Sequence, residues 1–428
     1  MDRGRVAVVG GGLSGLAAGL ALKDAGFSVE LFERSRLLGG RATSFEIDGR
    51  EVDNGQHVFL GACTAFVAFV ERVGMGSALA FQERFDVTAF RHGRSSRLRA
   101  LPLPAPWHVA FSLATYRHLS WRDRLSVGRA LIRIAKEREN AEPFERWLDR
   151  AGQSARARAS FWEPFIVPAL NLPLARVRTG DAAFVIATAF FGDPRAARFG
   201  WSRVPLAHIA QAAAAKLDRV HTSAPVFRIA FDSEGVVLHL EGERGARFEG
   251  AVLAVAPPQL ARIVEEPRRL GIPLLAGWEP EPIVDVHVWH DRGPLEFEFA
   301  ALLDSPVQWV FQKDRDYLCC SLSAAGEMAD AATDAVIARC WEELRAGVPA
   351  LRDARLVRGA VTRNPNATYA PSSTTTRPPA HTSDPRIALA GSWLATGWPD
   401  TMESAVRSGL DAAEVLARLP LAHGVASA

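Results

Sequence analysis

Three glycines near the start of the chain have the spacing of a loop that binds a dinucleotide. Gly10, Gly12 and Gly15 form a G-x-G-x-x-G pattern between a short apolar run and a helical segment. Gly10 permits the tight turn, Gly12 lets the backbone approach a pyrophosphate, and Gly15 lets strand and helix pack closely. Glu33 follows at the distance expected for an acceptor of ribose hydrogen bonds, and its charge would repel a 2′-phosphate. We predict a dinucleotide other than NADP, contacted by Gly10, Gly12, Leu13, Ser14, Gly15, Glu33 and Arg34.

An α/β framework is needed to position this loop, and the apolar pattern predicts one. The run 6–9 is typical of a buried parallel strand, 16–25 of a helix that ends at Gly26, and 29–32 of a second strand. Further strands are predicted at 225–231, 235–240, 251–257, 283–289 and 386–391, and further helices at 333–347 and 402–419.

The middle of the chain has a different pattern. Residues 121–149 predict an amphipathic helix broken near Pro143, and the apolar stretches 161–170 and 182–191 indicate core, or alternatively the lining of an apolar pocket. The segment 365–385 has the composition of a loop.

The order of these segments predicts two intertwined domains. Pieces 1–65, 205–275 and 381–420 would form a discontinuous nucleotide-binding domain of Rossmann-like α/β type. Pieces 66–204 and 276–380 would form an inserted α+β substrate-binding domain whose first part is mostly helical.

Two further motifs bear on which dinucleotide binds. The first is Arg36-Leu-Leu-Gly-Gly-Arg41, followed by the run 45–53, and the second is the run 389–409. Both resemble motifs of the flavin amine oxidase and phytoene desaturase superfamily. The resemblance implies FAD as the cofactor, with the start of the last helix lying under the flavin ring, where a helix N-terminus would stabilise negative charge. The contacts that it implies are Gly39, Gly40, Arg41, Val226, Gly391, Ser392, Thr401 and Met402.

The sequence departs from the superfamily pattern at two positions. Ser392 stands where an acid that contacts the ribityl or phosphate region is usual, and Ser404 stands where glycine is usual. Because a hydroxyl group can still donate or accept a hydrogen bond, we expect altered FAD contacts and retained binding.

A narrower resemblance rests mainly on the Asn-Gly-Gln-His stretch of the run Asp53–Cys63 and on a Leu-Pro-Ala-Pro block within 101–108. This run, together with segments at 101–108, 161–164, 169–171 and 366–368, is similar to the bacterial hydroxysqualene dehydroxylases of hopanoid synthesis. The resemblance places Gly55, Gln56 and His57 beside the flavin ring. It implies a hydrophobic C30 isoprenoid substrate, and removal of its allylic hydroxyl group with reduced FAD as hydride donor.

The sequence leaves the acid for such a reaction open. His57, Glu163 and Asp53 are the candidates for proton donation or substrate positioning, with Tyr369 as a weaker one. His57 could instead have a structural hydrogen-bonding role, and Asp53 could simply hold the backbone of the 53–61 loop. Two alternative functions are a carotenoid desaturase or amine oxidase, and a non-catalytic lipid-binding protein on the same scaffold. An amine oxidase of the aromatic-cage type is disfavoured because the chain has only three tyrosines.

Composition excludes several classes of function. The net charge is +2, from 50 basic and 48 acidic side chains, so no global field favours nucleic acid. The four cysteines lack the spacing of a disulfide scaffold or a zinc site. His287 and His290 lie three apart in the strand-like run Val286–His290 and should face opposite sides, so no metal is predicted. The start of the chain has no signal-peptide pattern, and no stretch reaches 18 apolar residues, so we expect a cytoplasmic protein.

One stretch nevertheless suggests contact with a membrane surface. Residues 101–116 are rich in proline and aromatic side chains and are flanked by Arg97, Arg99 and Arg117. They could dock peripherally on the inner face of the cell membrane, or simply pack over the substrate pocket. His108, within this stretch, is expected at the surface or at an interface.

Overall fold

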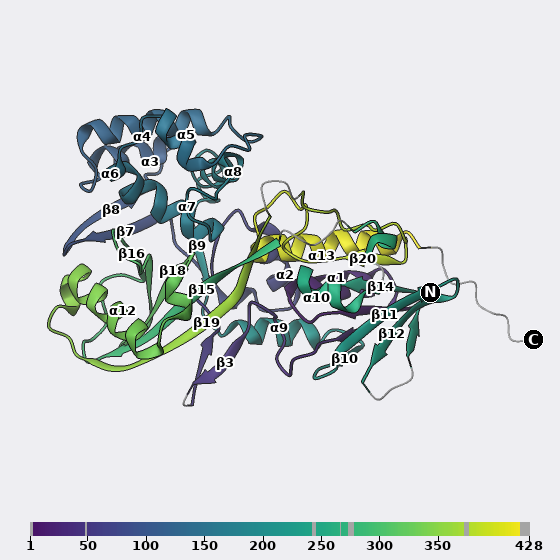
Figure 1. Ribbon diagram of the computed structural model, residues 1–428. Helices are drawn as coiled ribbons and strands as arrows, with labels where there is room; N and C mark the ends of the chain where they lie inside the picture. The colour runs from purple at the N-terminus through teal and green to yellow at the C-terminus, as the bar shows by residue number, and fades with distance from the viewer. Residues whose placement is uncertain are drawn as a thin grey trace, which may run out of the picture.

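The computed structural model describes residues 3–47, 49–241, 245–265, 267–272, 278–371 and 376–419 (Figure 1). A five-stranded parallel sheet with strand order β10-β2-β1-β14-β20 forms the base of the molecule. This order, which is 3-2-1-4-5 in chain sequence, is that of a mononucleotide-binding Rossmann half. The predicted α/β class with a Rossmann-like domain is therefore confirmed. The strands are β1 (Arg5–Val9), β2 (Ser28–Phe32), β10 (Arg219–His221), β14 (Gly250–Leu253) and β20 (Ile387–Leu389).

Side chains of this sheet alternate between two cores. Val6 and Val8 of β1 pack with the helices on one face, whereas Ala7 and Val9 pack with a small antiparallel sheet on the other. On the helical face, α13 lies against α1 so closely that a Cβ atom on Gly409 would come within 2.2 Å of the Ser14 carbonyl oxygen. The helical face holds α1 (Leu13–Asp24), α2 (Thr64–Arg72), α9 (Leu206–Ala214) and α13 (Met402–Ala417). The other face holds β11 (Val226–Asp232), β12 (Gly235–Leu240), β13 (Ala246–Phe248) and α10 (Pro257–Ile263).

A second, larger sheet of seven strands has the order β19-β15-β18-β17-β16-β7-β8 and is antiparallel except where β16 meets β7. Helix α12 covers one face of it over an aliphatic core. The strands are β7 (Asp86–Arg91), β8 (Arg94–Arg99), β15 (Trp278–His290), β16 (Phe299–Leu302), β17 (Trp309–Asp314), β18 (Tyr317–Ser323) and β19 (Leu356–Pro371). The helices and turns beside it are α11 (Glu327–Asp330), α12 (Thr333–Gly347) and η4 (Pro349–Leu351), whereas η3 (Pro267–Leu270) packs with the small antiparallel sheet of the Rossmann-like domain.

The long strand β19 corrects one prediction. The start of the segment predicted as loop at 365–385 is strand up to Pro371, because residues 368–371 pair with 278–281 of β15. The strand connects the large sheet to the Rossmann-like domain (Figure 1). Residues 372–375 lie outside the described part of the chain.

The helical part stands at one end of the molecule, above the large sheet in the view of Figure 1. The predicted break near Pro143 is confirmed, since α4 ends at Ile134 and α5 begins at Phe144. Ser120 and Asp123 form a reciprocal capping box at the start of α4. Side chains of both apolar stretches, 161–170 and 182–191, enter one core. The elements are α3 (Trp107–Thr115), α4 (Trp121–Ile134), α5 (Phe144–Arg150), α6 (Ala155–Ala157), the π-turn η2 (Arg158–Trp162), α7 (Glu163–Leu170) and α8 (Thr179–Phe190).

Short strands join the two large bodies. A hairpin of β3 (Ser44–Ile47) and β4 (Arg50–Asp53) leads into the 53–57 loop, and a three-stranded sheet has the order β5-β9-β6. These connections bring the 53–57 loop between the Rossmann-like domain and the large sheet. The remaining elements are β5 (Val58–Leu60), η1 (Gly76–Ala78), β6 (Leu79–Phe81) and β9 (Phe199–Ser202).

Candidate active site

The glycine loop has the geometry that its spacing predicts. Gly10 has φ +112°, and a Cβ atom there would lie 2.3 Å from the Ala254 carbonyl oxygen. A Cβ atom on Gly15 would lie 2.0 Å from the Gly10 carbonyl oxygen. These two glycines are therefore required by the turn and by helix packing, whatever ligand binds.

Gly12 differs, because the space beside it is open. A Cβ atom there would find nothing closer than the Gly40 Cα atom at 3.8 Å. Gly12 is the N-cap of α1 and no side chain caps that helix, so its first N–H groups face this space. Gly39 donates to the Gly11 carbonyl oxygen at 2.8 Å, so the two glycine motifs line one cradle. An anionic pyrophosphate fits this cradle.

Glu33 ties the glycine loop to the neighbouring strand. Its carboxylate accepts hydrogen bonds from the backbone of Gly11 at 2.7 Å and of Ser35 at 2.8 Å. Its carbonyl oxygen accepts from Ala224 at 2.9 Å, which brings the start of β11 at Val226 close. Each carboxylate oxygen keeps a second lone pair for a ribose hydroxyl group.

Arg41 is held by an acid that sequence reasoning missed. Its guanidinium group donates to both Asp400 oxygens at 3.0 Å, to the Ala367 carbonyl oxygen at 2.8 Å, and to the Ser392 hydroxyl group. Burial raises the pKa of Asp400, but the charge and hydrogen bonds of Arg41 and a hydrogen bond from Ser392 outweigh it, so the net pKa is lowered. Asp400, eight positions after Ser392, thus brings a carboxylate to the same Arg41 guanidinium group that Ser392 contacts.

Tyr369 completes this corner of the site. Its backbone N–H donates to the Asp400 carboxylate at 2.8 Å, and its ring lies 5.5 Å from the Arg41 guanidinium carbon. The phenol is buried beside the cofactor loops.

The last helix begins where the motif predicts. Thr401 is the N-cap of α13, and its hydroxyl group accepts from the Ser404 backbone at 3.3 Å. Ser404, the second departure from the superfamily pattern, is accommodated because its hydroxyl group donates to the Ser392 carbonyl oxygen at 2.8 Å. Glu403 is fully buried and accepts from the backbone of Phe66 at 2.8 Å, which ties α13 to α2. Gly391 has φ +155° and lies against the Trp393 indole.

Asp53 is a structural anchor in this geometry. One of its oxygens accepts from the Ser44 hydroxyl group at 2.7 Å and from the backbone of Leu206, the first residue of α9, at 2.9 Å. The Lys313 ammonium group lies 3.8 Å from the other oxygen. The contacts favour the role of holding the loop over that of proton donor.

His57 is a partly buried neighbour of Asn54. Its Nε2 atom lies 3.3 Å from the Asn54 side-chain oxygen. Burial lowers the pKa of His57, the charges of Lys313 and Arg41 lower it further, and Asp53 opposes them. The imidazole is therefore neutral at neutral pH, which suits a group that orients a hydroxyl group by hydrogen bonding.

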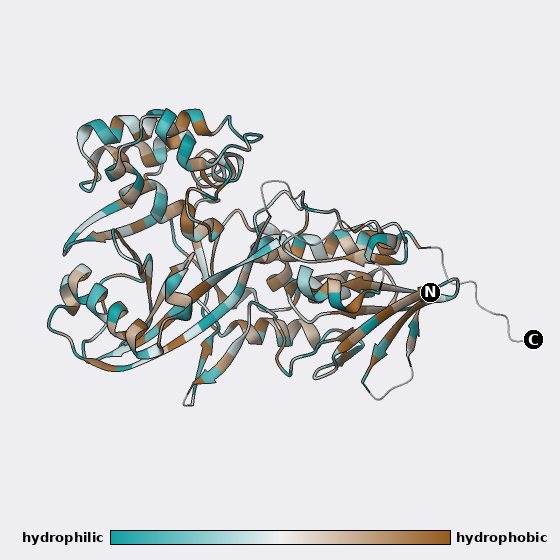
Figure 2. Cartoon of the chain, viewed as in Figure 1, coloured by the Kyte–Doolittle hydropathy of each residue, from teal (hydrophilic) through white to brown (hydrophobic). Residues whose placement is uncertain are grey.

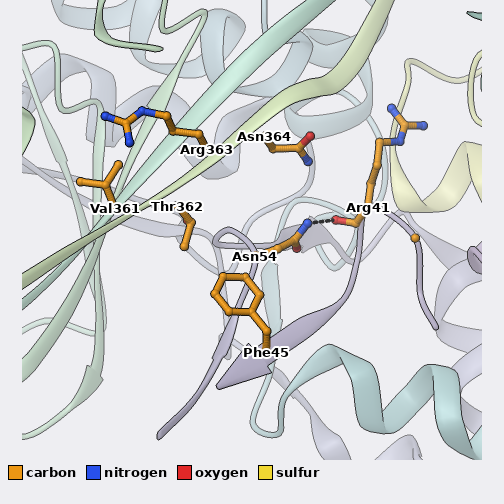
Figure 3. A pocket seen from close by; sticks show the side chains of 8 residues that line it. Arg41, Phe45, Asn54, Val361, Thr362, Arg363 and Asn364 are labelled. Atoms are coloured by element: carbon orange, nitrogen blue, oxygen red, sulfur yellow. Dashed lines mark hydrogen bonds between the residues drawn. The ribbon is translucent and has the colours of Figure 1, made fainter. Parts of the chain in front are cut away.

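A cavity of about 380 Å³ lies against this loop. Figure 3 shows Asn54 and Phe45 on one side of it and the strand β19 on the other, with the Thr362 side chain pointing towards Asn54. Asn54 donates to the Arg41 carbonyl oxygen at 2.8 Å, which fixes its amide. The residues that line the cavity are Gly40, Arg41, Phe45, Asn54, Val361, Thr362, Arg363 and Asn364.

The hydroxyl group of Thr362 is directed by a buried hydrogen-bonded chain. The His287 ring lies 2.7 Å from the Tyr317 hydroxyl group through Nδ1, and 3.3 Å from the Thr362 hydroxyl group through Nε2. The buried Tyr317 hydroxyl group satisfies its hydrogen by donating to Nδ1, so Nε2 carries the imidazole hydrogen and donates to Thr362. The Thr362 hydroxyl hydrogen is then left for the cavity.

Two other candidate residues lie elsewhere. Glu163 is exposed at the start of α7, and the charged groups that act on it are Asp304, Arg158 and Glu145, so the structure does not bring it to the 53–57 loop. His108, expected at the surface or at an interface, is fully buried, because α3 turns it inward against β8; both of its ring nitrogens lack a hydrogen-bond partner in the described part of the chain.

Comparison with known proteins decides the family. The family model for flavin containing amine oxidoreductase matches residues 13–417. The chain belongs to this family. Its cofactor is FAD, and it is an FAD-dependent oxidoreductase, so both of those predictions are confirmed and the non-catalytic alternative is not supported. The cradle at Gly12 and the acceptor Glu33 fit the ADP part of FAD.

Relatives of this family member match over its whole length. It is 24% identical to hydroxysqualene dehydroxylase of Zymomonas mobilis, with 95% of this chain and 98% of the relative covered. It is 27% identical to hydroxysqualene dehydroxylase of Rhodopseudomonas palustris, over 96% and 98%. It is 23% identical to 15-cis-phytoene desaturase of Synechococcus elongatus, over 97% and 96%.

Solved structures show the same fold. Putrescine oxidase bound to putrescine matches with a TM-score of 0.76 at 20% identity, over 98% of this chain and 100% of that chain. Cyclohexylamine oxidase of Brevibacterium oxydans matches with a TM-score of 0.73 at 20% identity, over 97% and 98%.

Proposed function

We propose that this flavoenzyme removes the hydroxyl group of hydroxysqualene reductively to give squalene, the C30 hydrocarbon. The observation that carries the proposal is the placement of the Asp53–His57 run, on which much of the narrower resemblance rests. Asn54 of this run lines the cavity together with Gly40 and Arg41 of the second glycine motif, and His57 lies 3.3 Å from the Asn54 side-chain oxygen. The full-length similarity to hydroxysqualene dehydroxylases of two organisms supports the same substrate class.

The reaction needs a hydride, a proton and a site for the leaving hydroxyl group. Bound in its reduced form, FAD supplies the hydride. The chain itself must hold the allylic hydroxyl group. Among the polar residues that line the cavity, Thr362 and Asn54 lie on opposite sides, and the neutral His57 imidazole lies 3.3 Å from the Asn54 side-chain oxygen. They would orient the hydroxyl group so that it accepts a proton and leaves as water. Asp53 and Glu163 are poor sources of that proton, since the first is engaged by Ser44 and Leu206 and the second is remote.

An anaerobic assay tests this function. The FAD-loaded protein, reduced with dithionite, is mixed with hydroxysqualene, and squalene is measured together with reoxidation of the flavin absorbance. We expect one squalene for each flavin reoxidised. Persistent reduced flavin and unchanged hydroxysqualene would exclude the proposal.

A carotenoid desaturase is the second candidate, because the similarity to 15-cis-phytoene desaturase also covers the whole chain. It would run the flavin in the oxidative direction and would need an external electron acceptor. Oxidised protein with phytoene and a quinone separates the two functions. An amine oxidase with an aromatic cage is disfavoured, because none of the three tyrosines lines the cavity.

We also propose that the enzyme collects its substrate from the inner face of the cell membrane. None of the described residues forms a helix long and apolar enough to cross a bilayer. The exposed apolar side chains Trp107 and Phe111 on α3, and Trp121 and Leu125 on α4, together form what we term the α3–α4 surface. The two helices are adjacent, because Arg124 donates to the Ala114 carbonyl oxygen at 2.6 Å.

The charges around the α3–α4 surface differ from those predicted. Arg97 and Arg99, expected to meet headgroups, both pair with Asp86 instead. Arg117, Arg122 and Arg129 are exposed and form no ion pair with a described carboxylate. They would face anionic headgroups, at about 1 kcal/mol each.

A further inference from the structure

Buried polar side chains alternate with aliphatic ones along the central strand of the large sheet. Val284, Val286 and Val288 of β15 pack in the aliphatic core against α12. Asp285 and His287, each 1% exposed, therefore point to the opposite face, towards the 53–57 loop. An acid is almost never buried to this extent without a specific partner or function.

The Asp285 carboxyl group fits directly under the loop. One oxygen accepts from the Gln56 backbone at 3.2 Å, and the Ser321 hydroxyl group donates to the carboxyl group from the neighbouring strand β18. A Cβ atom on Gly55 would lie 2.7 Å from the other oxygen. The glycine at 55 is thus explained by the acid beneath it.

The same carboxyl group adjoins the cavity wall. Asp285 is paired in register with Thr362 of β19, so the two side chains are neighbours on one face. Thr362 lines the cavity on one side, and Asn54, which precedes Gly55, lines it on the other. Asp285 lies immediately behind the wall that these residues form.

Several ionisable groups face Asp285. Lys313 reaches it from β17 and Asp53 from β4, while Tyr317 and Cys319 reach it from β18. Cys320 lies on the other face of β18, in the core against α12. Burial raises the pKa of Asp285 to about 7, and Asp53 adds to this, although the Gln56 N–H, Ser321 and Lys313 oppose it. His57 and His287, by contrast, are kept neutral, since burial lowers the pKa of each.

We propose that Asp285 stores the proton that leaves with the substrate's hydroxyl group as water. The inference rests on the proposed function. The carbon–oxygen bond of the allylic alcohol breaks, its oxygen takes the proton and departs as water, and the carbon takes a hydride from the reduced flavin. The proton passes from the Asp285 O–H through the Thr362 hydroxyl group, and solvent then reprotonates the carboxylate. Asp285 is thus a positioning residue that acts through Thr362.

The substitution Asp285→Asn keeps the acceptor for the Gln56 N–H but removes the transferable proton. We expect FAD to remain bound and turnover at pH 7 to fall about 10²-fold or more. The wild-type rate should decline above about pH 7 as Asp285 loses its proton, and this decline should be absent in the variant. An unchanged rate and pH profile in Asp285→Asn would overturn the inference.

Two neighbouring substitutions test the same group when Asp285 itself is intact. The hydrogen bond from Ser321 and the positive charge of Lys313 both lower the pKa of Asp285. Ser321→Ala removes the first, and Lys313→Met removes the second. Each should move the decline in rate to higher pH, which a purely structural role would not do. A decline that stays at the wild-type pH in both variants argues against the stored proton.

Stability supplies a readout that needs no turnover. An unfolded aspartate has a pKa of about 3.9, so the folded chain binds an additional proton between about pH 4 and pH 7. Stability contributed by this proton is complete below pH 4 and is lost as pH rises through about 7. Asp285→Asn should remove that part of the slope of Tm against pH, and an identical slope would overturn the inference. A wild type that never converts hydroxysqualene would instead refute the proposed function, and the inference with it.

Discussion

At the scale of single residues, the three loop glycines have separable roles. Gly10 and Gly15 are required by the fold, whereas a side chain at Gly12 would meet only open space in the cradle. We predict that Gly12→Val yields a folded protein that is purified without its flavin absorbance, because the valine occupies the path of the pyrophosphate. Gly128→Val on α4, where a Cβ atom is also unobstructed, is the matched control and should retain FAD. Stoichiometric FAD in Gly12→Val would show that the loop is misassigned.

The pair of Arg41 and Asp400 gives a second prediction. Asp400→Ala leaves the Arg41 guanidinium group without its acid, and should lower the free energy of unfolding by about 2 kcal/mol. This loss is smaller than the loss expected when one partner of a fully buried ion pair is removed, because the Arg41 side chain is 34% exposed. The double variant Ser392→Asp with Asp400→Ser should recover most of the loss, since the acid returns to the position usual in the superfamily. Denaturant titrations of the apoprotein measure both, and a double variant no more stable than Asp400→Ala would contradict the exchange.

Site residues that lie close together in sequence motifs could be identified from the sequence alone. Site residues whose partners lie far away in the sequence could not. The cradle glycines and Glu33 stand in short runs of the sequence. The spacing within these runs indicates a dinucleotide-binding loop. Asp400 and Asp285 act on groups more than 200 positions away, so no local spacing marks them. The alternation Val284-Asp-Val-His-Val288 was a usable signal, because two polar residues at every second position of a buried strand must face a polar site.

At the scale of elements, the N-terminal cap of the last helix can be tested directly. Thr401 caps α13, whose first turn also carries Glu403 to the start of α2. Thr401→Ala should destabilise the protein by about 1 kcal/mol, because the Ser404 N–H loses its acceptor. Thr401→Ser, which keeps the hydroxyl group, is the control and should be close to wild type by thermal unfolding. Equal losses in the two variants would mean that the cap contributes nothing.

Elements with strong local signals were predicted well, and those set by distant pairing were not. The strands at 6–9 and 29–32 and the helix at 333–347 have apolar patterns that leave little choice. The segment 365–371 has the proline and threonine content of a loop, yet it is strand because residues 368–371 pair with 278–281 of β15, beyond an irregularity in the register. His108 was misjudged for a similar reason, since its burial depends on β8, which the helix α3 packs against.

At the scale of the whole molecule, the candidate site is built where the Rossmann-like domain, the large sheet and the 53–57 loop meet. The Rossmann-like domain supplies the cradle, the large sheet supplies Asp285 and Thr362, and the 53–57 loop lies between them. The helical part projects at the far end from the parallel sheet, which leaves the α3–α4 surface free to meet another body (Figure 2). A substrate that is nearly insoluble in water would reach this site from a bilayer.

The α3–α4 surface therefore gives the last prediction. Trp107 and Phe111 are 63% and 61% exposed, so replacing both with serine removes large apolar side chains without opening a core. The wild type should float with vesicles that contain anionic lipid, and less so at high salt, because Arg117, Arg122 and Arg129 act through charge. The double serine variant should float several-fold less while keeping its Tm and its FAD. A matched variant, Phe227→Ser, removes an aromatic side chain that is 54% exposed on β11 and should float like the wild type. A wild type that stays out of the vesicle fraction, or a double variant that floats equally well, would exclude this surface as the membrane contact.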